Sequence, residues 1–476
     1  MSSTNTKAMK SGAWYIFSNF LVRGMALITT PIFARLLTHE QVGDYSNFHS
    51  WLNIATIVIT MRMEASLISA KFDYHDRLQE YNRSMIALMT VVTVVWAIVL
   101  NLFRDFFTAQ MNIGLLYINL ILLYSFFHAI VNIFQMNERY QFRYKRSVAV
   151  ALLVAFSTTL TSIFLVLTMR DRLLGRVLGS ILPVAVIGFV LMLGFFRRGR
   201  SIDPYAWPYT LRISFPYVPH LLSLTVLNSV DRIMITRISG SADNALYTIA
   251  YSCGHMVSIL MTAMNNAYAP WLGDKLHDGS ENEIRKVSKY YMLIFATLAL
   301  GMMLLAPEIL LIMGGKSYLE AKYVMPPVSM GCVCQFLYTQ YVNVEQFKKK
   351  TAGMAVASLF AALLNYGLNA FFIPRYGYVA AAYTTLAGYL FLLVAHMFLV
   401  KRMDLDDIYD NKFVLGLTAV MMLLTIGVNY IYASSLVRYL CVGAYVVIIG
   451  IVAWNNRKLI RKLFDLVFRK MKRREN

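Results

Sequence analysis

Long apolar segments alternate with short polar loops along most of this chain. An α-helix rises 1.5 Å per residue, so about 20 apolar residues cross the roughly 30 Å hydrocarbon core of a bilayer. Segments of this length can be placed at about 12–34, 46–69, 84–103, 113–136, 147–168, 174–196, 210–231, 245–271, 290–313, 324–346, 352–373, 378–400, 412–433 and 437–454. The pattern predicts an all-α integral membrane protein with about 14 transmembrane helices.

The first six predicted helices and the next six repeat with an offset of 202 residues. This offset places Arg35 on Arg237 and Tyr45 on Tyr247, each just beyond the outer end of its helix. Because six is even, both groups enter the membrane from the same side, which predicts a pseudo-two-fold axis along the membrane normal and a central cavity. The predicted units are an N-terminal half at 1–203, a C-terminal half at 204–403, helices 13 and 14 at 404–456, and a basic tail at 457–476.

Composition supports the membrane assignment and fixes the orientation. The 476 residues are 58% hydrophobic and 15% charged, with a mean hydropathy of +0.54, which is too apolar for a soluble domain. The net charge is +20, and most of the 45 lysines and arginines lie in loops on one side, for example at 348–350. Basic loops are typically cytoplasmic, so both termini are predicted to be cytoplasmic. Topology thereby explains the charge, and no nucleic-acid partner is expected.

The tail at 457–476 has its own pattern, in which apolar positions recur at helical spacing among lysines and arginines. This spacing predicts an amphipathic helix on the anionic cytoplasmic leaflet, with membrane lipids as its partners. A plain solvated basic tail is the alternative.

Arg23 is the only fully charged residue of the first predicted helix and lies near its midpoint. A guanidinium keeps its proton, and a charge at that depth costs at least ~2.5–3.5 kcal/mol. Asn19 lies one turn before it and Thr30 two turns after it on the same face. We therefore predict that Asn19 and Arg23 bind substrate in a cavity. The alternative is a helix–helix hydrogen bond, or an arginine whose side chain extends to the interface.

Helix 2 carries a second charged cluster, Arg62 and Glu64. Residues two apart on a helix face different directions, so we expect that the two cannot neutralise each other and that each needs a partner from another helix, water or a ligand. Arg62 is a substrate-binding candidate, with extension to the interface as its alternative. A carboxyl group buried in a span suits proton transfer, so Glu64 is an ion-coupling candidate.

Helix 7 contains Pro216 and Pro219, each of which lacks a backbone donor. We predict a kink or an unwound turn there that serves as a gate, although prolines also kink helices for packing alone. Asp231 and Arg232 are placed at the end of this span, where Asp231 is an ion-coupling candidate and the pair either bonds across helices or caps the cavity mouth.

Other polar residues lie within spans. His128 in helix 4 and His255 in helix 8 are ion-coupling candidates, although single membrane histidines are more often packing residues. Asn265 and Asn266 in helix 8 match the depth of the helix 2 cluster through the 202-residue offset, which makes them substrate-binding candidates. Adjacent amides also commonly bond neighbouring helices.

Enzyme, metal and cofactor motifs find little support. The four cysteines lie in apolar spans, which indicates neither a disulfide framework nor a metal site. The MGGKS segment at 313–317 resembles the end of a phosphate loop, but Leu310 stands where that loop needs glycine. We therefore predict no catalytic residue, no metal and no cofactor.

Several segments resemble one family of membrane proteins. PIFARLLTHEQVGDYS at 31–46 is similar to its first helix exit, and the segment at 215–252 resembles its helix 7–8 region, with the prolines, the Asp-Arg pair and Tyr-x-x-Ala-Tyr. AYAPWL at 267–272, APEIL with KSYLEA at 306–321, and IPRYGYVAAAYTT at 373–385 also match. The chain therefore resembles the polysaccharide transport (Wzx-type) family of the multidrug/oligosaccharidyl-lipid/polysaccharide exporter (MOP) superfamily.

The resemblance implies a flippase that moves undecaprenyl-diphosphate-linked oligosaccharide repeats across the bacterial plasma membrane by alternating access. It implies a basic cavity, in which Arg23 and Arg62 match the diphosphate-binding arginines of related lipid II flippases. A polysaccharide polymerase and a chain-length regulator are expected partners. Two alternatives stay open. One is an ion-coupled multidrug exporter of the same fold, which would need acidic residues in the cavity. The other is a membrane-embedded glycan polymerase or ligase.

Overall fold

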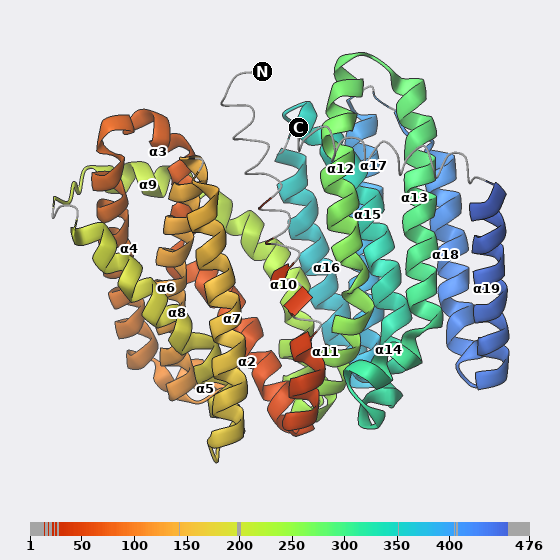
Figure 1. Ribbon diagram of the computed structural model, residues 1–476, viewed down its shortest axis with the longest axis horizontal. Coiled ribbons are helices and arrows are strands. Elements are labelled where there is room, and N and C mark those ends of the chain that lie inside the picture. Colours follow the sequence, from red (N-terminus) through yellow and green to blue (C-terminus); the bar gives the residue numbers. More distant parts are fainter. Residues whose placement is uncertain are drawn as a thin grey trace.

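The computed structural model describes residues 28–455 except 142, 198–200, 351, 404 and 406–407, together with positions 14, 18, 21, 22, 24 and 25. Within this part of the chain every regular element is a helix (Figure 1). Nine of these helices are long and apolar enough to span a membrane, or ten if the bent segment from His39 to Asp73 counts as one span. The fold is therefore an all-helical membrane fold, as the sequence predicted.

The elements follow one another in chain order. The first group is α2 (His39–Thr60), η1 (Met63–Ser66), α3 (Leu67–Asp73), η2 (His75–Arg77), α4 (Leu78–Leu102), α5 (Arg104–Met111), α6 (Leu115–Tyr140), α7 (Tyr144–Thr168) and α8 (Arg172–Arg197). The second group is α9 (Ala206–Ser214), α10 (Tyr217–Ile238), α11 (Ser241–His255), α12 (Val257–His277), α13 (Glu281–Leu304), α14 (Ala306–Met313), η3 (Lys316–Val324), α15 (Met325–Phe347), α16 (Ala352–Tyr376), α17 (Tyr378–Lys401), α18 (Asn411–Ile431) and α19 (Ser435–Asn455).

Three helices, α10, α12 and α15, are as long as the nine apolar spans but are not among them. Their sequences contain more polar residues, which lowers their mean hydropathy, and of the three only α15 is largely buried. Hydropathy alone therefore finds fewer spans among the described residues than the 14 predicted from the sequence.

Several predicted spans are broken. The span expected at 46–69 ends at Met61 and Arg62, which both adopt left-handed backbone conformations with φ of 47° and 50°, and the helices on either side differ by 52° in direction. A left-handed residue is unfavourable for side chains with a Cβ atom, so this break is held by its surroundings. The spans expected at 245–271 and 290–313 are also each divided in two, at Met256 and Leu305.

Small residues set the close packing of the first half. A Cβ atom on Gly175 or Gly179 of α8 would lie 2.8 Å and 2.3 Å from backbone atoms of Leu165 and Ser162 on α7. These glycines are four residues apart on one helix face, the spacing that allows two membrane helices to approach closely. The interface between α7 and α8 therefore depends on the absence of side chains at these positions.

The two halves meet at one end of the molecule, which we call the closed end and define by residues 35–48, 236–248 and 312–318. There α2 packs on both α10 and α11, in the lower part of Figure 1. The Ser46 and Thr248 hydroxyls lie 2.6 Å apart, Asn244 donates to the Gly43 carbonyl oxygen at 2.9 Å, and His39 lies 3.2 Å from Ser317. Ser46 and Thr248 are separated by 202 residues, which is the offset of the predicted repeat, and the repeat stays a prediction.

The last two helices, α18 and α19, lie beside the second half, at the right edge of Figure 1. Both pack on α13, and α18 also packs on α15. Arg438 at the start of α19 donates to both carboxylate oxygens of Glu308 on α14, and Tyr439 donates to the same group. Paired hydrogen bonds of this kind fix orientation, so α19 is anchored at one end.

Candidate functional site

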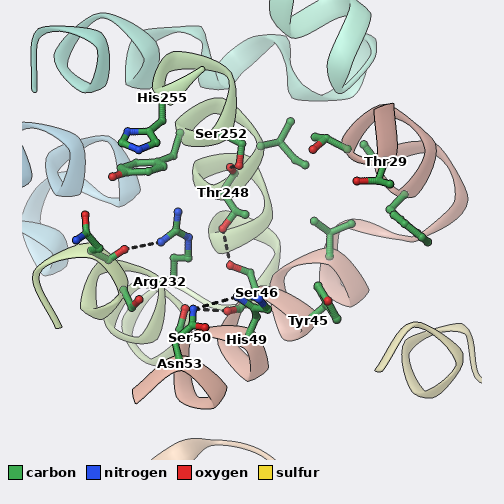
Figure 2. A pocket seen from close by; sticks show the side chains of 18 of the residues that line it. Thr29, Tyr45, Ser46, His49, Ser50, Asn53, Arg232, Thr248, Ser252 and His255 are labelled. Carbon is green, nitrogen blue, oxygen red and sulfur yellow. Dashed lines mark hydrogen bonds between the residues drawn. The ribbon is translucent and has the colours of Figure 1, made fainter. Parts of the chain in front are cut away.

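A central cavity of about 620 Å³ lies directly against the closed end, between the two halves. Figure 2 shows Ser46, His49, Ser50 and Asn53 along one wall, which α2 provides, and Arg232 on the side of the second half. The full lining is Thr29, Thr30, Phe33, Ala34, Leu37, Val42, Tyr45, Ser46, His49, Ser50, Asn53, Arg176, Asn228, Ser229, Arg232, Thr248, Ile249, Tyr251, Ser252, His255 and Gln335. Ser46 and Thr248, whose hydroxyls meet at the closed end, both line the cavity. The closed end therefore forms the floor of the cavity.

Arg176 of α8 enters this cavity with its guanidinium group over two aromatic rings. The guanidinium carbon lies 3.7 Å from the ring centre of Phe33 and 4.5 Å from that of Tyr45. Such stacking orients the planar guanidinium and leaves its N–H donors at the edge. No hydrogen bond joins these donors to another side chain or carbonyl of the described residues. The donors are therefore available to a ligand in the cavity.

A second arginine, Arg232 of α10, lines the cavity from the other half. Its guanidinium carbon lies 4.6 Å from the ring centre of Tyr251, and one nitrogen donates to the Asn228 carbonyl oxygen at 2.7 Å. His49 of α2 lies within electrostatic reach of both Arg176 and Arg232. The two arginines thus act on one volume from both halves.

Among the described residues, the lining contains no aspartate or glutamate. Its charged members are the two arginines, and it also contains two histidines, His49 and His255. The remaining lining is hydroxyl, amide and apolar. A cavity of this charge favours an anionic ligand over a cation.

Of the first predicted cluster, Thr30 lines the cavity, whereas Asn19 and Arg23 lie outside the described residues. Their predicted role in substrate binding stays a prediction.

The expectation that Arg62 and Glu64 could not neutralise each other is wrong. Arg62 Nη1 lies 3.3 Å from Glu64 Oε1, because the helix breaks at Met61 and Arg62 and the helical spacing no longer applies. The Glu64 carboxylate is buried, while the Arg62 side chain is 36% exposed. Neither residue belongs to the described lining of the central cavity. The pair lies at the break between α2 and η1, and its roles in binding and coupling stay predictions.

Replacing Arg62 with alanine is expected to destabilise the protein, because Glu64 would remain buried without its partner. We expect a loss of about 1–3 kcal/mol, less than for a fully buried pair because Arg62 is partly exposed. The measurement is the unfolding midpoint in detergent, and adding Glu64→Gln should restore much of the loss. Arg104→Ala is the control, since the Arg104–Asp105 pair is exposed. Equal midpoints for all variants would contradict this account.

The placement of Asp231 and Arg232 at the end of helix 7 is also wrong, because α10 continues to Ile238. The two neighbours face opposite ways: Arg232 lines the cavity, and Asp231 is buried among helices of the second half, 1% exposed. Its carboxylate accepts hydrogen bonds from the Tyr247 hydroxyl at 2.6 Å, the Asn369 amide at 2.7 Å and the Thr385 hydroxyl at 2.6 Å. Asp231 therefore forms hydrogen bonds across helices and does not cap the cavity mouth.

The other histidine and asparagine candidates are divided between cavities and helix interfaces. His255 lines the central cavity, where its ring stacks on Tyr251. His128 lines a second cavity, described below. Asn265 accepts a hydrogen bond from Asn343 of α15 at 2.9 Å, so it joins neighbouring helices, and Asn266 lies on the exposed side of α12.

The predicted irregularity at the prolines of helix 7 lies at Phe215 and Pro216, between α9 and α10. Pro219 falls in the first turn of α10, where a missing N–H costs little. α9 itself packs on the first half, where Thr210 and Tyr209 bond to Tyr81 and Asp73. The gating role of the prolines stays a prediction.

Sequence reasoning missed Arg176, Arg232 as a cavity residue, and His49. Arg176 lies only one turn inside α8, close to a helix end, where basic residues are common at the membrane interface. The available signal was its setting in LLGRVLG, where an arginine is surrounded by apolar residues and glycines.

Comparison with known proteins agrees with this architecture. A family model described as "Polysaccharide biosynthesis protein" matches residues 8–275, more than half of the chain. The chain belongs to this family. An uncharacterised membrane protein of Haemophilus influenzae is 21% identical over 417 residues, covering 84% of this chain and 98% of that protein.

Solved structures define the fold. The lipid II flippase MurJ, in an inward closed conformation, superposes with a TM-score of 0.65 at 14% identity, covering 93% of this chain and 99% of MurJ. An inward-facing multidrug resistance transporter of the MATE family superposes with a TM-score of 0.61 at 14% identity, covering 82% and 98%. This member of the polysaccharide biosynthesis family is thus a multi-pass membrane protein with the helical fold of MOP-superfamily transporters.

Proposed function

We propose that this protein is a flippase for undecaprenyl-diphosphate-linked oligosaccharide repeats in the assembly of a cell-surface polysaccharide such as O-antigen, capsule or exopolysaccharide. The observation that carries the proposal is Arg176, whose guanidinium is held by two aromatic rings with its donors unused, in a cavity whose described lining has no carboxylate. A diphosphate offers the matching acceptors, since guanidinium and phosphate form paired charge-assisted hydrogen bonds. Membership of the polysaccharide biosynthesis family supports a glycan as the rest of the substrate.

The proposed transport mechanism depends on the division of the protein into two halves. A sugar diphosphate cannot cross about 30 Å of hydrocarbon unaided, whereas its lipid tail can stay in the bilayer. The protein therefore needs a polar cavity that opens to each side in turn, and contact at the closed end belongs to one of these states. Separation of the closed end and closure of the opposite end would release the head group. Ion coupling at Glu64, Asp231, His128 or His255, and contact with a polymerase and a chain-length regulator, belong to this proposal.

The direct test uses purified protein in liposomes that contain undecaprenyl-diphosphate-linked oligosaccharide. The proposal expects the lipid-linked sugar to become accessible to a membrane-impermeant glycosidase at an increased rate, with the recovered substrate otherwise covalently unchanged. Elongation of the glycan would identify a polymerase instead. Export of a cationic drug without movement of the lipid-linked sugar would identify a multidrug exporter, the alternative that the basic cavity disfavours.

Topology is tested separately by reporter fusions. The closed end is proposed to be periplasmic and the loops at 277–280 and 348–350 cytoplasmic, because basic residues concentrate in the cytoplasmic loops. Fusions within 104–112 and 375–377 should therefore report the periplasm, and a fusion at Lys349 the cytoplasm. The reversed pattern would contradict the proposed orientation of an inner-membrane protein with both termini cytoplasmic.

A further inference from the structure

A second cavity of about 410 Å³ lies within the first half, between α2, α6, α7 and α8. We call it the side cavity. It shares Thr29, Tyr45, His49 and Arg176 with the central cavity. Arg176 therefore stands at the junction of the two, and a ligand bound to its guanidinium borders both volumes.

The side cavity has a different chemistry from the central one. One face of α6 supplies Tyr124, His128, Asn132 and Gln135, which follow one another at helical spacing. The Tyr124 and His128 rings stack at 5.0 Å with an angle of 13° between their planes, and the Asn132 amide nitrogen lies 3.4 Å from His128. This face combines flat rings with two amides that both donate and accept hydrogen bonds.

Apart from Arg176, the opposite wall is neutral as well. Thr158 and Thr159 of α7 and Ser180 of α8 add hydroxyl groups, and Arg176 is the only lysine, arginine or carboxylate in the described lining. The Thr158 and Ser180 hydroxyls already donate to backbone carbonyl oxygens of their own helices, so only their acceptor capacity is free, whereas the Gln135 amide has no side-chain hydrogen bond to the described residues. A lipid chain could not form hydrogen bonds with these groups. A ligand rich in hydroxyl groups satisfies them, and the volume lies in the range of about 300–1,000 Å³ typical of small-molecule sites.

We propose that the side cavity binds the sugar attached directly to the diphosphate, and that Asn132 and Gln135 select it. This inference rests on the proposed function, because it takes the diphosphate to lie at Arg176. The glycosidic oxygen then joins a phosphate at the junction to a sugar within the first half. The phosphate on the lipid side lies in the central cavity, and the lipid tail stays in the bilayer. The first half thereby determines which lipid-linked glycan is accepted.

The test compares two kinds of ligand on the full chain in lipid nanodiscs by calorimetry. One is inorganic pyrophosphate, and the other is a panel of hexosyl 1-diphosphates carrying glucose, galactose, N-acetylglucosamine or N-acetylgalactosamine. At least one panel member is expected to bind 10-fold or more tightly than pyrophosphate. Asn132→Leu and Gln135→Leu should each reduce this preference, the ratio of the pyrophosphate Kd to the sugar-diphosphate Kd, to about three or less. Pyrophosphate binding itself should stay unchanged.

Asn101→Leu is the matched control, because Asn101 is an exposed amide on α4 that bonds to Asn119 outside both cavities. It should keep the wild-type ratio, and the unfolding midpoints establish that all variants are folded. If no sugar diphosphate binds more tightly than pyrophosphate, or if the leucine variants weaken both ligands equally, the sugar site is overturned while the proposed function stands. If wild-type protein does not bind pyrophosphate at all, the diphosphate site fails, and the sugar site with it.

Discussion

Replacing Arg176 with alanine is expected to abolish transport while leaving a folded protein in the membrane. The substitution removes paired hydrogen bonds to the diphosphate, each with a net value of about 1.5 kcal/mol for a charged group. Two such bonds amount to about 3 kcal/mol, or roughly 100-fold in Kd. The measurements are pyrophosphate binding by calorimetry and flipping of lipid-linked oligosaccharide in liposomes.

Arg176→Lys separates charge from geometry. Lysine keeps the positive charge but loses both the planar group that stacks on Phe33 and Tyr45 and the paired donors, so an intermediate loss of about 10-fold is expected. Arg172→Gln is the matched control, because Arg172 lies one turn earlier on α8, outside the cavity, and donates to the Leu36 carbonyl oxygen. If Arg176→Ala binds and flips substrate like the wild type, the arginine at the junction has no part in the mechanism.

Replacing Gly43 with alanine is expected to prevent the two halves from meeting at the closed end. A Cβ atom at Gly43 would lie 1.7 Å from the Ser241 carbonyl oxygen and 2.9 Å from the Ser241 Cα atom, so backbone would have to move. The adjoining bonds from Asn244 to the Gly43 carbonyl and from Ser241 to Asp44 would be lost with it. Transport should fall 10-fold or more, since one of the two required states is destabilised.

The state of the closed end is measured through a cysteine introduced at Thr248, which bonds to Ser46 at the cavity floor. With the native cysteines replaced by serine, Gly43→Ala should increase its reaction with a membrane-impermeant maleimide several-fold. Gly194→Ala serves as the control, because a Cβ atom at Gly194 of α8 meets no atom within 4 Å. Unchanged labelling together with unchanged transport would show that the closed end does not require this close approach.

The sequence predicted the features that depend on composition and period. An all-helical membrane protein follows from apolar segments of bilayer length, because hydrocarbon excludes any backbone group that lacks an internal partner. The family was also predictable, since the segments at 31–46 and 215–252 fall within the region matched by its model. Hydropathy was less informative for α10, whose interior position permits the polar residues that a lipid-facing helix excludes.

At two places the sequence could not predict which side chains pair. The Arg62–Glu64 pair forms because the chain leaves the helix at Met61, and no propensity rule places left-handed conformations at a methionine and an arginine. Asp231 and Arg232 are neighbours in sequence, yet one is buried against α16 and α17 and the other enters the cavity. Only the packing of α10 decides which face meets which neighbour.

By itself, the sequence determined that the chain is helical, that it spans the membrane many times and that its loops carry an asymmetric charge. These properties depend on each segment's own length, hydropathy and charge. The tertiary structure alone decided that Arg176, His49 and Arg232 share one cavity, because they come from α8, α2 and α10 and meet only when both halves pack. The site depends on contacts between distant segments, and periodicity within one segment contains no information about its partners.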